Sequence, residues 1–430
     1  MFFYWQKIVL FVQPNYIWCN TKVEGFKGLG FDFPIEVICE GMANVIVPKL
    51  EAFRRGVWDY APSKAPVFYN PLMRTCRDIA VLALQSYQRI VGRDLSIAEP
   101  LAGCGVRGIR FAIEVEGLGS IYLNDINEKA YAIIQHNIQL NDLTSRIFAS
   151  NEDANLFLAR YAAPKKRFDF IDIDPFGSPA PYMDSALRAL RNGGLLALTA
   201  TDMAPLCGVY PRVALRKYGG FSLRTEYCHE IAVRLLAGCL AMTAAKYNIG
   251  VKMVFSHSTD HYARLYALVN YGAKSADKSL EEMGYILHCF KCFHREAHRE
   301  MILAHNMTCC ECGSILKAAG PLWIGEIADK NFCTLMEENL KSLKYEHIGS
   351  EARRIVSLVK EEADAPATYY VIDKICDRIG VPTPPLKEVI DHIREMGFRA
   401  VRTHFHGRGI KTDAPASAVI KVVRELAGLK

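Results

Sequence analysis

The sequence predicts an α/β fold with a mostly parallel sheet, followed by a smaller α+β domain. Short apolar strands alternate with helical segments between residues 95 and 200, a pattern typical of a parallel sheet with helices on both faces. Two long apolar runs, VKMVFSHS and ARLYALVNY, follow with only a few residues between them, too few for a crossover helix. We therefore expect a sheet of seven strands that ends in an antiparallel hairpin.

The elements are expected in a regular order along the chain. The alternating runs IEVICE and NVIVPKL, joined by a GMA turn, predict an N-terminal hairpin. Asn70 and Pro71 supply a cap and a first-turn proline for a helix that runs to about residue 90. The remaining helices are expected after a glycine-rich turn, over 128–141, from about 181 and over 225–246, and the remaining strands are LSIAE, SIYLN, RIFAS, FDFIDI and LLALTA.

Length and composition favour two domains. A chain of 430 residues with 50% hydrophobic residues can bury a core in each of them. We expect residues 1–33 to form an N-terminal extension without an assigned structure. The sheet domain is predicted over residues 34–272, and a C-terminal domain over residues 273–430.

Composition also bounds the location and the partners of the protein. No apolar stretch reaches the roughly 18 to 20 residues that a membrane crossing needs, because Arg234 interrupts the longest candidate. The first residues lack a small-residue cleavage site, and the cysteines fit a reducing compartment. We expect a cytoplasmic protein that needs neither a membrane nor an obligate protein partner. The formal net charge of +6 permits a polyanionic partner without requiring one.

A glycine-rich loop follows the first strand of the sheet. Gly103, Gly105 and Gly108 form a G-x-G-x-x-G sequence, whose backbone can approach a nucleotide at a helix N-terminus. Asp125 ends the next strand and is placed to accept hydrogen bonds from ribose hydroxyls. Both features would serve NAD equally well. Arg107 favours S-adenosylmethionine, because a guanidinium can hold the carboxylate of that cofactor.

Asp153 and Ala154 follow the third strand in the sequence NEDAN. A carboxylate or backbone group at this point can meet the edge of an adenine. The alternative interpretation of Asp153 is a helix N-cap.

The fourth strand runs directly into Asp174, Pro175, Phe176 and Gly177. An exocyclic amine on a base is a poor nucleophile, because its lone pair is delocalised into the ring. Asp174 and the carbonyl of Pro175 could each accept one N–H and direct that lone pair toward a methyl donor. Phe176 could stack on the base, or it could be a core aromatic. Asp174 could also be a turn former, and Asp172 is expected to be structural.

Two cysteine pairs predict a zinc site in the C-terminal domain. Cys289, Cys292, Cys309 and Cys312 have the paired C-x2-C arrangement that encloses a tetrahedral ion. Four thiolates leave no open position, so the metal is expected to be structural. The open alternatives are free core thiols, or substitution of one ligand by a neighbour. Those neighbours are Cys310, His288 and His294.

Basic residues gather near the C-terminus. Arg399, Arg402, Arg408 and Lys411 lie in a segment with few acidic residues, where a polyanionic partner could bind. The alternative is an ordinary solvated face.

The predicted fold and these motifs resemble known proteins. An otherwise parallel, Rossmann-like sheet with a terminal antiparallel hairpin resembles the class I methyltransferase fold. From about Pro34 to about Ala414 the chain resembles the archaeal and eukaryotic tRNA guanine-26 N2-dimethyltransferases. The matching segments are VFYNP, CRDIAVLAL, GCGVRGIRFA, LNDINEKA, NEDAN, IDPFGSPAPYMDSA, the cysteine pairs, GPLWIGEI and RTHFHGRGIKTDAP.

The resemblance implies a function and a set of site residues. It implies two successive methyl transfers from S-adenosylmethionine to N2 of guanine 26 in tRNA. Action on an RNA guanine at another or an additional position, a nicotinamide-dependent dehydrogenase and a nonenzymatic RNA-binding module are the alternatives. Arg77, otherwise interpreted as a surface charge, is expected at the cofactor on this ground alone. The other implied contacts are Arg107, Asp125, Asp153 and Ala154 to the cofactor, Asp174 and Phe176 to guanine, and the four cysteines to zinc. The resemblance also implies that the C-terminal domain binds tRNA, with its basic segment at the phosphates.

This chain departs from the family at one motif position. Cys76 stands where the family commonly has asparagine, and we expect this change to affect packing rather than chemistry. Nothing is carried over to the first 33 residues.

Overall fold

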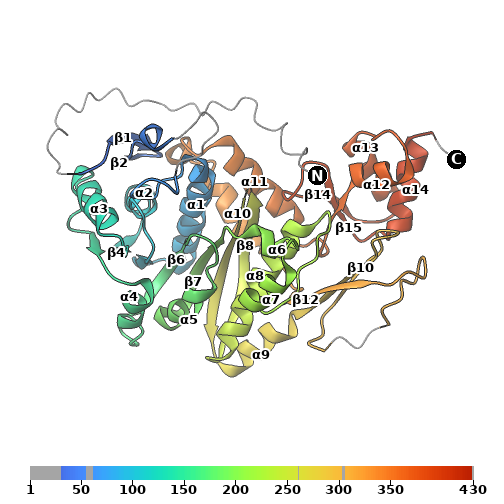
Figure 1. Cartoon of the computed structure of the whole chain (residues 1–430), viewed down its shortest axis with the longest axis horizontal. Coiled ribbons are helices and arrows are strands. Elements are labelled where there is room, and N and C mark those ends of the chain that lie inside the picture. The colour runs from blue at the N-terminus through green and yellow to red at the C-terminus, as the bar shows by residue number, and fades with distance from the viewer. Residues whose placement is uncertain (1–30, 55–61, 260, 303–305, 429–430) are drawn as a thin grey trace.

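A seven-stranded sheet forms the centre of the molecule (Figure 1). The computed structural model describes residues 31–54, 62–259, 261–302 and 306–428. The strand order is β5-β4-β3-β6-β7-β9-β8, in which β3 to β7 are parallel and β9 is antiparallel to both neighbours. The predicted sheet and its antiparallel hairpin are confirmed. The strands are β3 (Leu95–Glu99), β4 (Leu118–Asn124), β5 (Ile147–Ser150), β6 (Phe168–Ile173), β7 (Leu190–Ala200), β8 (Ile249–Thr259) and β9 (Tyr262–Tyr271).

Helices cover both faces of this sheet and bury two apolar cores. One core lies under α1, α2 and α3, and the other under α4, α5 and α8. The predicted hairpin is present as β1 (Ile35–Glu40) and β2 (Ala43–Pro48), and it packs on the first core. The helices are α1 (Arg74–Val91), α2 (Val106–Glu114), α3 (Glu128–Leu140), α4 (Ala154–Arg160), α5 (Ala180–Ala189), α6 (Met203–Leu206), α7 (Pro211–Tyr218), α8 (Cys228–Ala245) and α9 (Ala273–Glu281).

Two smaller antiparallel sheets follow, with orders β11-β10-β12 and β13-β15-β14. Part of this C-terminal chain returns to the central sheet, because Phe332, Met336 and Ile355 belong to the same core as α1. A separate core lies among α12, α13 and α14. The elements are β10 (Met283–His288), β11 (Arg295–His298), β12 (Lys317–Trp323), α10 (Lys330–Asn339), α11 (Ser350–Glu362), β13 (Tyr370–Val371), α12 (Ile372–Ile379), α13 (Leu386–Glu395), β14 (Ala400–Arg402), β15 (Gly409–Thr412), α14 (Ala416–Leu426) and the 3-10 turns η1 (Leu50–Phe53), η2 (Pro71–Met73) and η3 (Leu343–Tyr345).

Helix α8 is the one described helix that is long and apolar enough to cross a membrane by length and composition. It is 67% buried inside the protein, as a core helix is. Arg234 in its middle pairs with Glu230 and donates to the carbonyls of Trp323, Ile324 and Gly325. The buried guanidinium of Arg234 is therefore paired and hydrogen-bonded. Through these carbonyl contacts, α8 also binds the C-terminal chain where it packs back on the central domain.

Candidate functional site

A cavity of about 440 Å³ lies beyond the carboxyl ends of β3, β4 and β6. Ligands bind at this edge in open α/β sheets. The structure brings Gly103, Arg107, Asp125 and Asp174 together on the cavity wall, although they come from three different strand ends. Asp174 therefore lies in the same cavity wall as Arg107 and Asp125.

The glycine-rich loop takes a conformation that favours glycine. Gly103 and Gly105 have φ of 57° and 76°, in the left-handed region. A Cβ on Gly105 would lie 3.1 Å from Ile134, and one on Gly108 only 2.3 Å from Leu123. The loop can therefore turn tightly between β3 and α2, so that backbone groups line the cavity.

Asp125 fixes this loop and remains available to a ligand. One carboxylate oxygen accepts from Gly103 N at 2.8 Å, and the other accepts from Asn127 N at 3.0 Å. Burial raises the pKa of Asp125, and the two backbone N–H groups oppose that rise. Each oxygen keeps a further lone pair, which suits ribose hydroxyls.

Arg107 is the centre of a buried charge cluster. It pairs with Asp172 at 3.0 Å, with Glu99 at 3.5 Å and with Oδ2 of Asp174. Asp172 is fully buried and also pairs with Arg264 at 2.5 Å, in agreement with its expected structural role. The Arg107 guanidinium is therefore occupied by carboxylates, and a cofactor carboxylate would have to share it.

Cys76 also touches this cluster. Nη2 of Arg107 lies 3.8 Å from Sγ of Cys76 in a hydrogen bond to sulfur. The departure from the family at this position therefore reaches the charged site as well as the packing of α1.

Glu99 is a cavity residue that the sequence analysis missed. It ends β3, lies within the cavity wall and accepts from Gly108 N at 3.1 Å. Burial raises its pKa to about 8; Arg107 opposes this shift, and Asp172 and Asp174 add to it. The signal that could have found it is an acidic residue at the end of the strand before the glycine-rich loop.

Glu99 should make stability depend on pH. Its folded-state pKa of about 8 lies above the ordinary value of 4.5, so its favourable contribution is complete below pH 4.5 and disappears as the pH rises through about 8. We expect the unfolding free energy of the wild type to fall over this window more than that of Glu99→Gln. Urea unfolding at a series of pH values measures both slopes. Parallel slopes for the two proteins would contradict the assignment.

The loop after β6 presents Phe176 to solvent. Phe176 is 69% exposed and meets Phe68 edge-on, with ring centroids 4.4 Å apart, so its interpretation as a core aromatic is wrong. Gly177 N donates to Oγ1 of Thr201 at 2.7 Å, and its carbonyl accepts from Thr201 N at 2.9 Å. The end of β7 thus holds the loop, while buried Pro175 precedes the exposed ring.

Asp153 and Ala154 are placed differently from the other cofactor candidates. The Asp153 carboxylate accepts from Asn155 N at 2.9 Å and from Leu156 N at 3.1 Å, and so caps α4. Ala154 is buried. Neither residue is in the wall of the 440 Å³ cavity. The alternative of a helix N-cap is therefore observed for Asp153.

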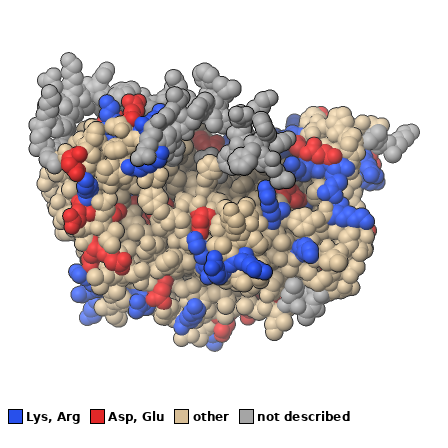
Figure 2. Space-filling model, viewed as in Figure 1, with Lys and Arg blue, Asp and Glu red and all other residues tan. Residues whose placement is uncertain are grey.

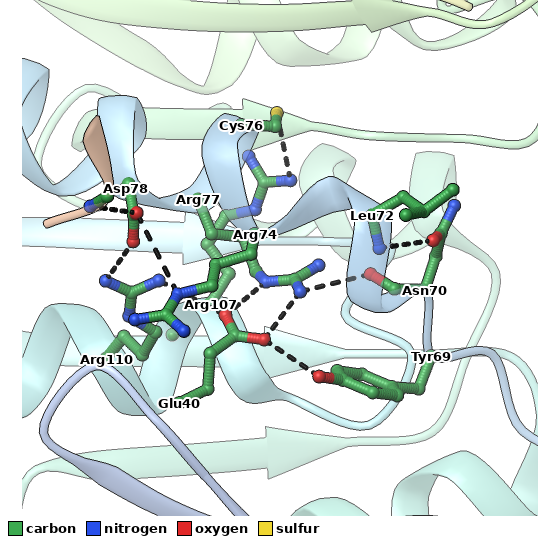
Figure 3. Close-up of polar contacts among 12 residues, drawn as sticks. Glu40, Tyr69, Asn70, Leu72, Arg74, Cys76, Arg77, Asp78, Arg107 and Arg110 are labelled. Atoms are coloured by element: carbon green, nitrogen blue, oxygen red, sulfur yellow. Dashed lines mark hydrogen bonds and ion pairs between the residues drawn. The ribbon is translucent and has the colours of Figure 1, made fainter. Parts of the chain in front are cut away.

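Arg77 is buried, so its interpretation as a surface charge is wrong. Nε and Nη2 donate to the two oxygens of Glu40 at 2.5 and 2.6 Å, and Nη2 also donates to the Asn70 carbonyl at 3.1 Å (Figure 3). Tyr69 donates to Glu40 at 3.0 Å, and Arg110 pairs with it at 3.1 Å. Glu40 of the N-terminal hairpin thereby holds Arg77 at the cavity wall.

The four predicted cysteines converge in the C-terminal chain. All four Sγ atoms lie within 4.8 Å of one another, with 3.4 Å between Cys289 and Cys312 and 3.5 Å between Cys292 and Cys309. Cys310 instead contacts His294 at 3.5 Å. Four converging thiols on two tight turns fit a tetrahedral zinc site.

The predicted basic segment is mostly neutralised. Lys411 is buried and pairs with Glu230 at 2.8 Å and with Glu362 at 3.9 Å, so it is not on a surface that RNA could reach. Arg399 pairs with Asp364, and Arg408 pairs with Asp373 at 2.9 Å. Arg402 is exposed.

A second basic surface lies over α7, where Figure 2 shows Lys and Arg side chains gathered on the visible face. Residues 203–225 carry four basic side chains and no acidic one, a signal that the sequence analysis overlooked. Arg212, Arg216 and Arg224 are exposed, and they form no ion pair with any residue that the structure describes. Tyr210 and Phe221 beside them are 58% and 44% exposed. We call these five residues the α7 surface.

Comparison with known proteins gives the family. A family model described as N2,N2-dimethylguanosine tRNA methyltransferase matches residues 41–424. A tRNA (guanine(26)-N(2))-dimethyltransferase of Methanothermobacter thermautotrophicus is 42% identical over 367 residues, which are 85% of this chain and 94% of that protein. The Aquifex aeolicus protein named tRNA (guanine(26)-N(2)/guanine(27)-N(2))-dimethyltransferase is 36% identical over 395 residues, 91% of this chain and 96% of that protein.

A solved structure agrees with the predicted fold. The complex of Trm1 from Pyrococcus horikoshii with S-adenosyl-L-methionine has a TM-score of 0.78 and 33% identity, over 90% of this chain and 99% of that chain. The class I methyltransferase fold is therefore confirmed, and the dehydrogenase interpretation of the glycine-rich loop is overturned. With a family model that spans nearly all of its length, the chain belongs to the N2,N2-dimethylguanosine tRNA methyltransferases.

Proposed function

We propose that the protein transfers methyl groups from S-adenosylmethionine to the N2 amine of guanine 26 in tRNA, twice in succession. This proposal rests on the position of Asp174. It lines a cavity whose other walls, the glycine-rich loop and Asp125, suit a nucleoside. Oδ2 of Asp174 is held by Arg107, while Oδ1 makes no hydrogen bond within the described part of the chain. That oxygen is free to accept an N–H from the base.

The residues present fit the cofactor. Asp125 would accept the ribose hydroxyls, and the backbone at Gly103 and Gly105 would approach the nucleoside closely. Arg77 and Arg107 are the cationic groups of the wall for the amino-acid carboxylate. Asp153 and Ala154 stay candidates for the adenine edge from beside the cavity. When bound, the cofactor supplies an electrophilic methyl group on a positively charged sulfur.

The loop after β6 would prepare the guanine amine. Asp174 and the Pro175 carbonyl each accept one N–H, so that the nitrogen lone pair points at the methyl donor. As the new N–C bond forms and the C–S bond breaks, one proton leaves the amine, and Asp174 can accept it. The exposed ring of Phe176 can stack on the base after it leaves the RNA stack. The monomethylated amine keeps one N–H for the second transfer.

The four cysteines would hold zinc in a structural role. Their thiolates fill a tetrahedral shell, so no position is left for a substrate. The ion would fix the two turns of the C-terminal chain that carry these residues.

The α7 surface is proposed to contact tRNA phosphates, with Arg402 as a further candidate. Its arginines, which form no ion pair within the described ranges of the chain, and its exposed rings suit a nucleic-acid backbone with unstacked bases. We expect Arg212→Gln with Arg216→Gln to raise the KM for tRNA and to lower the salt slope of binding by about 1 for each lost phosphate contact. The exposed Lys421→Gln of α14 serves as the control. Filter binding across a salt series measures the slope, and an unchanged slope would refute this contact.

Mapping the modified nucleotide tests the function itself. Transcribed tRNA is incubated with labelled cofactor, and the product is analysed by nucleoside mass spectrometry and by position. Label at guanine 26 supports the proposal, and a tRNA with adenine at that position should carry no label there. A second candidate is additional action on guanine 27, because one relative is named for both positions.

A further inference from the structure

A second group of soft metal ligands lies near the start of α8, apart from the four-cysteine cluster. The ligand atoms of Cys207, Cys228 and His229 all lie within 4.8 Å of one another. Cys207 follows the short helix α6, whereas Cys228 and His229 open α8. Folding therefore joins two thiols and an imidazole from two separate segments.

The two thiols and the imidazole make few polar contacts with the rest of the described fold. Sγ of Cys207 makes a weak hydrogen bond to the Cys228 carbonyl at 3.6 Å. The His229 ring is half-buried, and no hydrogen bond or ion pair holds it among the residues that the structure describes. A sheltered imidazole normally has a polar partner. Here both thiols offer a sulfur within 4.8 Å of the ring.

We propose that Cys207, Cys228 and His229 bind a zinc ion, with water in the fourth position. Two thiolates and one imidazole form a ligand set that zinc uses with an open position. Binding forms two Zn–S bonds and one Zn–N bond, and the two thiols release their protons to solvent. Nothing is oxidised or reduced in this step.

The ion would close a loop that carries the α7 surface. Residues 207 and 228 are the two ends of the chain segment that contains α7, Arg224 and Phe221. Cys207 follows Thr201 by six residues, with α6 between them, and Thr201 at the end of β7 holds Gly177 of the Asp174 loop. In Figure 1, α6, α7 and α8 lie side by side at this part of the molecule. A metal bridge here would fix α7 relative to the catalytic loop.

Metal content tests the proposal without reference to activity. Protein purified under reducing conditions is loaded with Zn²⁺, freed of excess ion and analysed by elemental mass spectrometry. We expect Cys207→Ser and Cys228→Ser each to hold about one zinc ion per chain fewer than the wild type. Cys239→Ser is the matched control, because Cys239 lies on α8 outside this group, near the Lys217 carbonyl at 3.8 Å. The expected difference is the same whether or not the four-cysteine cluster is loaded.

A Co²⁺ titration gives an independent readout. The thiolate-to-metal absorption should weaken in both serine variants. For His229→Gln, which keeps both thiols, the affinity of this site for Co²⁺ should fall at least about tenfold. Circular dichroism verifies that each variant is folded. If a serine variant does not fold, the comparison of His229→Gln with the wild type still tests the site. Equal metal content in the wild type and the variants would overturn the proposal. A Cys207–Cys228 peptide two hydrogens lighter than the reduced form would overturn it as well.

Discussion

Asp174→Asn should lower the rate of methyl transfer by about 10²- to 10⁴-fold while tRNA binding is largely kept. Asparagine preserves the shape of the side chain but removes the charge that localises the amine lone pair and takes up its proton. It also removes an ion-pair partner of Arg107, which still has Asp172 at 3.0 Å. Single-turnover kinetics with saturating cofactor measure the chemical step directly.

Two comparisons make this result specific. Asp277→Asn, on the exposed face of α9, should leave the rate unchanged. Cofactor affinity measured by calorimetry separates a loss of chemistry from a collapse of the cavity wall. A rate for Asp174→Asn within a few fold of the wild type would remove Asp174 from the proposed mechanism.

Glu40→Gln should lower the unfolding free energy by about 3 to 5 kcal/mol, the range for breaking a buried ion pair from one side. Glu40 lies between Arg77 and Arg110, both buried. Its neutralisation removes the carboxylate that pairs with Arg77, while Arg110 keeps Asp78 at 2.7 Å and Glu114 at 2.8 Å. Because Arg77 lines the cavity, cofactor affinity should fall as well. Glu36→Gln on the same strand is the control, since Glu36 forms no ion pair with either arginine.

The pH dependence of this effect has a definite sign. Burial would raise the pKa of Glu40, but Arg77 and Arg110 outweigh burial and hold it at about 2, below the ordinary 4.5. Its contribution is therefore present above pH 4.5 and disappears as the pH falls toward 2. The stability gap between wild type and Glu40→Gln, measured by urea unfolding, should shrink over that window. A gap that stays constant would mean that Glu40 is not ionised in the folded protein.

The sequence predicted the central sheet because its signal is local. Alternating strands and helices, the glycine-rich loop and the short link between the last two strands each depend on neighbouring residues. The position of Asp174 followed from a general property of parallel sheets, whose carboxyl ends share one edge. No long-range information was needed for these features.

The errors concern charges whose partners are distant in sequence. From its sequence neighbours alone Arg77 would be a surface charge, and only the resemblance placed it at the cofactor, because Glu40, on a hairpin 37 positions earlier, could not be paired with it in advance. Lys411 was assigned to RNA for the same reason, since its partner Glu230 lies 181 positions away. The converse error is the α7 surface, whose three arginines form no ion pair with the residues that the structure describes, although Asp202 nearby pairs with Lys217. Counting basic residues along the chain cannot tell a neutralised cation from a free one.

The buried contact of Lys411 with Glu230 has a consequence for anyone who wishes to shorten or recombine these proteins. Arg234 shares Glu230 with Lys411, so one acid of the catalytic half is buried between a base of its own helix and a base from the far end of the chain. A fragment that stops after the central sheet would lose the second base and would expose the Glu230–Arg234 pair and the apolar face of α8. Exchanging C-terminal halves between relatives should succeed only when the lysine travels with its glutamate.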